Sequence, residues 1–108
     1  MEENKLSADE ISALKKTHGT VHELNVPIND EETEFATIYL KKLDRATYSA
    51  VAAIVDKDEL QATEVMLKNL RVGGDPVEKI TSNFDALRAA VGQCVVLLRA
   101  KTGSLKKI

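Results

Sequence analysis

The sequence predicts an α+β fold, in which an N-terminal helix and an antiparallel β-hairpin pack on a small bundle of three to four helices. Residues 21–28 and 34–41 alternate apolar and polar side chains with the period of two that is typical of strands. The segments on either side repeat apolar residues at three- and four-residue steps, which is the helical period. A chain of 108 residues fits one domain, spanning residues 1–108. Residues 1–6 are expected to form a frayed N-terminus and residues 102–108 a mobile C-terminus.

The N-terminal helix and the hairpin carry start and stop signals. Ser7 followed by Glu10 has the spacing of a capping box, and His18-Gly19 ends the helix that this box begins. Residues 29–32 form a polar turn between the two strands, so an antiparallel hairpin is the simplest connection. Pro27 cannot donate a backbone hydrogen bond, so the first strand is expected either to lie at a sheet edge or to end there. A lone hairpin is marginal in water, and its apolar face is therefore expected to lie against helices.

Capped helical segments follow the hairpin. Asp44 is the expected cap of a helix over residues 45–55, and Asp58 is the expected cap of the next helix. Gly73 and Gly74 are predicted to end that helix in a turn, because glycine adopts the left-handed conformation at low cost. Asp75 is predicted to complete this turn and to cap the next helix, with Pro76 in its first turn. The apolar stripe of the Asp58 helix consists of Leu60, Thr63, Met66, Leu67 and Leu70.

The last helix is predicted to run over residues 83–101, with Ser82 and Asp85 at its cap. Val96 and Leu97 point away from the apolar seam that packs this helix on the domain. Because a helix face in water does not normally carry both residues, they indicate a second contact surface, covered either by the domain's own hairpin or by another chain. The seam itself consists of Phe84, Leu87, Val91, Cys94 or Val95, and Leu98.

Composition argues against several classes of function. The net charge of -2 leaves no basic excess to neutralise phosphates, so nucleic acid is not the expected partner. Aromatic residues make up 4% of the chain, which weakens any case for an aromatic-lined ligand pocket. The single cysteine, Cys94, fits a reducing cytoplasm. No apolar run approaches the roughly 20 residues of a membrane span, and the N-terminus lacks the positive charge of a signal peptide, so no membrane association is expected.

The residues with chemical potential favour structural roles. His18 and His22 have the spacing of metal ligands on a helix, but Gly19 lies between them at a predicted change from helix to strand. The acidic run over residues 30–34 lacks the glycine and terminal glutamate of a calcium loop and fits a solvated hairpin turn better. The Gly-Gly pair lacks the Lys-Ser/Thr of a phosphate loop. Cys94 has no base near it in sequence. We therefore expect no enzyme, no cofactor and no metal site.

Three stretches of the chain, taken in order, carry a resemblance to a known family. The sequence KKTHG begins at Lys15, the run IYLKKLDRAT begins at Ile38, and residues 57–75 contain MLKN followed by VGGD. These stretches resemble small tail assembly chaperone proteins of bacteriophages and prophages. The resemblance covers most of the chain from about Lys15 onward. It departs from the family before the Gly-Gly, where an aromatic residue is expected and the chain has Leu70-Arg71-Val72.

The resemblance implies a non-enzymatic protein that binds the tape measure protein during tail assembly, keeps its long helices soluble and leaves before the virion is complete. It also implies a location in the cytoplasm of a bacterial host. The hypothetical partner-binding residues are Val96, Leu97, Arg71 and Tyr39. The alternative is a small structural subunit of the virion, such as a connector or a capsid accessory protein. A homo-oligomer is compatible with either function.

Overall fold

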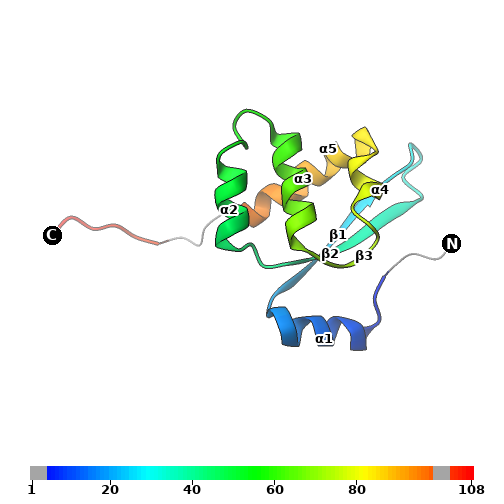
Figure 1. Cartoon of the computed structure of the whole chain (residues 1–108), viewed down its shortest axis with the longest axis horizontal. Coiled ribbons are helices and arrows are strands. Elements are labelled where there is room, and N and C mark those ends of the chain that lie inside the picture. The colour runs from blue at the N-terminus through cyan, green and yellow to red at the C-terminus, as the bar shows by residue number, and fades with distance from the viewer. Residues whose placement is uncertain (1–4, 99–102) are drawn as a thin grey trace.

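The computed structural model describes residues 5–98 and 103–108, and the fold is α+β, as the sequence predicts (Figure 1). The predicted frayed start at residues 1–4, and the predicted last turns of the final helix at residues 99–101, lie outside the described residues. The elements in chain order are α1 (Ala8–His18), β1 (Val21–Pro27), β2 (Phe35–Lys41), α2 (Arg45–Ala52), α3 (Glu59–Leu70), β3 (Arg71–Gly74), α4 (Glu78–Thr81), α5 (Phe84–Cys94) and the 3₁₀ helix η1 (Val95–Leu98).

The N-terminal helix α1 lies on the opposite side of the sheet from the other helices (Figure 1). Its capping box is confirmed, because the Ser7 hydroxyl accepts a hydrogen bond from the Glu10 amide and the Glu10 carboxylate accepts one from the Ser7 amide. Every residue of α1 keeps part of its surface exposed. Leu6, just before the helix, lies over Gly73 of the sheet and donates its amide to the Tyr39 hydroxyl. The chain is therefore already attached to the sheet at residue 6, within the segment predicted to be frayed.

The predicted hairpin is confirmed, and β2 is the central strand of three. β1 and β2 pair antiparallel from Val21 opposite Lys41 to Pro27 opposite Phe35. Pro27 ends an edge strand, where its missing N–H is tolerated. β3 pairs antiparallel with the other edge of β2, with an irregularity between Tyr39 and Leu40. β3 was not predicted.

The third strand corrects the prediction for the Gly-Gly segment. Helix α3 ends at Leu70, and Arg71 is already extended, so Gly73 and Gly74 do not cap the helix. Gly74 has a φ of +89°, and a Cβ added there would collide with the Thr37 carbonyl oxygen of β2. Close approach of two strands, rather than a helical stop, is thus what requires glycine. Asp75 does not cap α4 either, since the N-cap is Val77, which has no side-chain cap bond.

Helices α2 to α5 cover one face of the sheet and enclose the core. The caps Asp44 and Asp58 are confirmed, because their carboxylates accept the amides of Thr47 and Gln61. Helix α2 ends at Ala52, three residues short of the predicted end. The predicted stripe of α3 faces inward, with Leu60 partly exposed and the other four residues buried. The sheet contributes Leu24, Val26, Ala36, Ile38 and Leu40 to the same core.

The last helix differs from its prediction at both ends. Asn83, not Ser82, is the N-cap of α5, and its side chain accepts the Ala86 amide. Phe84, predicted to lie in the apolar seam, is 62% exposed and instead contacts the Arg88 guanidinium. The α-helix ends at Cys94 and tightens into η1, in which Val95 and Val96 are exposed while Leu97 and Leu98 pack against the core. Within residues 5–98 and 103–108, no helix is long and apolar enough to cross a membrane.

Candidate functional site

A groove lies where the start of β1, the end of β2, α2 and η1 meet. Its volume is about 810 Å³. Leu43 of the β2–α2 loop, Tyr48 of α2 and the η1 residues Val96, Leu97 and Leu98 supply its apolar side chains. We refer to this surface, which also includes Thr20, His22, Lys42, Asp44 and Arg45, as the η1 groove.

The η1 groove leaves large apolar side chains in contact with water. Val96 is 54% exposed and Tyr48 is 49% exposed. Leu97 is partly buried and packs against the core. A smaller cavity, lined in part by Leu24 and Leu40 of the hairpin, shares Val96 and Leu97 with the groove. The domain's own hairpin therefore covers part of the predicted second contact surface and leaves the rest open.

The rim of the η1 groove carries more positive than negative charge. Lys42 and Arg45 are exposed, and among the described residues neither takes part in an ion pair. The Asp44 carboxylate is already engaged, since it accepts the Thr47 amide at 2.8 Å and lies 3.4 Å from the Lys41 ammonium. Hydrogen bonds from Thr47 lower the pKa of Asp44, and Lys41 lowers it further. Two cations thus remain available to a ligand at the edge of an apolar floor.

Tyr39 lies inside the fold, which contradicts its place among the partner-binding residues. It is 2% exposed, and Leu6 lies against it on that face of the sheet. Its hydroxyl accepts the Leu6 amide at 3.2 Å, and burial raises the pKa of this hydroxyl. A partner cannot reach Tyr39 while the segment before α1 covers it.

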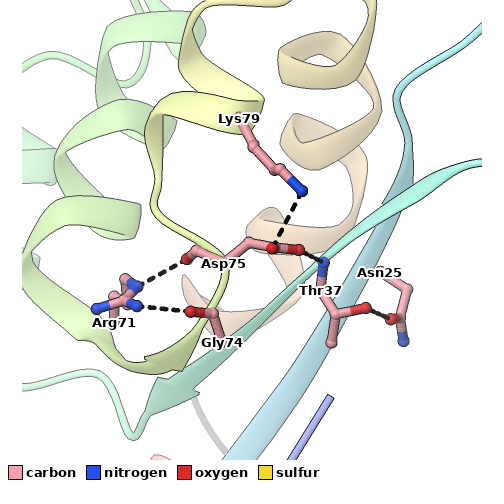
Figure 2. A network of polar contacts seen from close by, with 6 residues as sticks. All are labelled: Asn25, Thr37, Arg71, Gly74, Asp75 and Lys79. Atoms are coloured by element: carbon pink, nitrogen blue, oxygen red, sulfur yellow. Dashed lines mark hydrogen bonds and ion pairs between the residues drawn. The ribbon is translucent and has the colours of Figure 1, made fainter. Parts of the chain in front are cut away.

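Arg71 is exposed, yet its guanidinium is turned onto its own chain. Its Nε donates to the Asp75 carbonyl at 2.8 Å and one terminal nitrogen donates to the Gly74 carbonyl at 2.6 Å (Figure 2). Arg71 belongs to β3 at one edge of the sheet, whereas Val96 lies beside β1 at the other edge. The structure therefore does not bring the four hypothetical partner-binding residues together.

The best-connected polar cluster surrounds Asp75, which is 1% exposed (Figure 2). Its amide donates to the Thr37 carbonyl, and its carboxylate accepts the Thr37 amide, each at 2.8 Å. The side chain thus takes the place of the backbone carbonyl that would otherwise continue the ladder between β3 and β2. Lys79 lies 3.3 Å from the other carboxylate oxygen, and the Thr37 hydroxyl donates to Asn25. These contacts join two strands to α4, so the cluster is structural.

The remaining candidates from the sequence lie in different elements of the fold. His18 ends α1 and His22 is exposed on β1. The acidic residues 30–34 form the exposed hairpin turn, which Asn29 organises by accepting the Thr33 and Glu34 amides. Within the part of the chain that the structure describes, no group of three or more His, Cys, Asp or Glu side chains could hold a metal ion. Burial raises the pKa of the Cys94 thiol to about 11, which disfavours the reactive thiolate at neutral pH.

Sequence reasoning missed most of the η1 groove. Tyr48 was the signal available, because it is a large aromatic residue in a helix otherwise rich in small side chains. Lys42, which also lines the groove, belongs to the run from Ile38 that carries the family resemblance. Neither pattern shows that the β2–α2 loop and η1 meet in space.

Comparisons of the chain with protein-family models, with curated protein sequences and with solved structures give no match.

Proposed function

We propose that this chain is a non-enzymatic assembly chaperone of a bacteriophage or prophage tail. It binds the tape measure protein in the cytoplasm of the bacterial host and is released before the virion is complete. The observation that carries the proposal is the exposed apolar floor of the η1 groove, in a chain whose segments resemble such chaperones from about Lys15 onward.

The groove supports a binding function because exposed apolar patches on a folded domain mark sites of interaction. Val96, on the groove floor, is 54% exposed. A chaperone needs such a surface to shield the apolar side chains of its client. It must also release the client, and a groove of this modest size fits a transient contact better than a permanent one.

The residues with catalytic potential support a non-enzymatic role. The Cys94 thiol is buried, and its raised pKa keeps it protonated at neutral pH. The carboxylate of Asp75 is committed to the Thr37 amide. The proposed activity is therefore binding alone.

Co-expression with a tape measure protein encoded in the same genome tests this function. We expect the chain to raise the soluble fraction of that protein and to co-purify with it. No gain in solubility and no co-purification would refute the proposal. Mass spectrometry of purified mature particles separates it from the alternative, because a connector or capsid accessory protein remains in the particle and a chaperone does not.

A further inference from the structure

A ligand in the η1 groove meets side chains rather than backbone groups. Its walls are α2, η1 and the β2–α2 loop. The third and fourth amides of α2 are already bonded, since those of Thr47 and Tyr48 donate to the side chain and carbonyl of Asp44. An extended peptide gains affinity mainly by pairing its backbone with a sheet edge, and only the first residues of β1 reach this groove. A helix satisfies its own backbone and needs only an apolar surface to lie on.

The charges at the rim of the groove determine which charge is favoured on either side of the apolar stripe of such a helix. Lys42 and Arg45 stand at the edge of the apolar floor, while the one carboxylate there is held by Thr47 and Lys41. Negative side chains beside an apolar stripe are the complement to this arrangement.

We propose that the η1 groove binds an amphipathic helix whose apolar stripe is flanked by acidic residues. The stripe lies on Tyr48, Val96 and Leu97, and the acidic flanks face Lys42 and Arg45. The proposal rests on the proposed function only in that it specifies the chemistry of the client; the groove and its charges stand independently of that function.

Synthetic peptides of about 18 residues test the occupant, a length at which an isolated helix becomes accessible. One peptide carries leucines at positions i, i+3, i+4 and i+7 with glutamates on both sides of this stripe. A second replaces the glutamates with lysines, and a third is a scrambled version of the first. We expect the glutamate peptide to bind about tenfold more tightly than the lysine peptide at low salt, with the difference shrinking as salt is added. The scrambled peptide should not bind.

Substitutions in the protein locate the site. Val96→Asp is expected to weaken binding of the glutamate peptide by at least tenfold, because it places a charge on the apolar floor. Phe84→Asp is the matched control, since Phe84 is similarly exposed but lies outside the groove. The double variant Lys42→Glu and Arg45→Glu is expected to reverse the preference toward the lysine peptide. Folding of each variant is checked by circular dichroism before binding is measured.

Several results would overturn the proposal. These are equal affinity for the two charged peptides, unchanged binding by Val96→Asp, or an equal loss with Phe84→Asp. Dimerisation of the free chain that Val96→Asp abolishes would assign the groove to a second copy instead. A bound peptide that forms a strand, as seen from β-type NMR chemical shifts, would assign the groove to sheet extension. If Val96→Asp still solubilises a tape measure protein, the groove assignment fails while the proposed function survives.

Discussion

The Asp75 carboxylate is expected to contribute more to stability than any exposed ion pair of this protein. In Asp75→Ala the Thr37 amide, at a residue that is fully buried, loses the acceptor 2.8 Å away. A buried donor left without its partner costs roughly 1–3 kcal/mol. The ion pair with Lys79 adds less than about 1 kcal/mol, because the lysine side chain is 44% exposed and therefore screened. The expected loss for Asp75→Ala is about 2–3 kcal/mol.

Urea denaturation followed by circular dichroism measures this loss, with thermal melting as a second readout. For a domain of this size, 1 kcal/mol corresponds to about 4–8 °C in melting temperature. Asp75→Asn keeps an oxygen that accepts the Thr37 amide, so it should lose less than half as much as Asp75→Ala. Lys79→Ala isolates the ion pair and should cost under about 1 kcal/mol. The reasoning is refuted if Asp75→Ala lies within about 0.5 kcal/mol of wild type, or if Lys79→Ala is equally destabilising.

Three further outcomes follow from single positions. Gly74→Ala should destabilise the fold by about 2 kcal/mol or more, and clearly more than Gly19→Ala. Both glycines have positive φ, but only at Gly74 would the new methyl group meet another strand. Equal losses of stability in urea titrations would remove the steric argument. The pKa of Asp44 is lowered in the folded state, so the stability that its charge provides is present above the ordinary pKa of 3.8 and is lost as the pH falls through the lower folded pKa. Acid titrations of wild type and of Asp44→Asn, which keeps a capping oxygen, should show a steeper loss of stability in wild type. Parallel curves would contradict this. Because burial raises the pKa of the Cys94 thiol to about 11, labelling by a thiol reagent at pH 8 should be slow in the native protein and fast in urea, whereas rapid native labelling would mean that the thiol is accessible.

Local signals in the sequence were sufficient for most of the elements. Ser7, Asp44 and Asp58 each cap the helix that the sequence assigns to them, because capping depends on residues within a few positions along the chain. The hairpin register follows from its alternating pattern, since a slip by one residue would turn Leu24 and Val26 to the wrong face. Val96 and Leu97 indicated a second contact surface, and the hairpin covers part of it while Val96 stays 54% exposed.

The candidate site depended on contacts between distant segments. Leu43 and Tyr48 meet Val96 only because η1 returns to the end of the hairpin, and that path is set by the packing of α5 on α3 and β1. Tyr39 was a hypothetical partner-binding residue, and strand alternation assigns its side chain to a face of the sheet without showing what covers that face. Leu6 and α1 cover it, through contacts more than 30 residues apart in sequence.

The sequence by itself determined the α+β class, the hairpin and the starts of α1, α2 and α3, because each rests on a local period or on a cap. Only the tertiary structure decided that Arg71–Gly74 is a strand. Two glycines have low strand propensity, and the segment becomes extended because the free edge of β2 supplies its hydrogen bonds. The same pairing turned Gly74 from a helical stop into a point of close approach, and Asp75 from a helix cap into the residue whose carboxylate continues the ladder to Thr37.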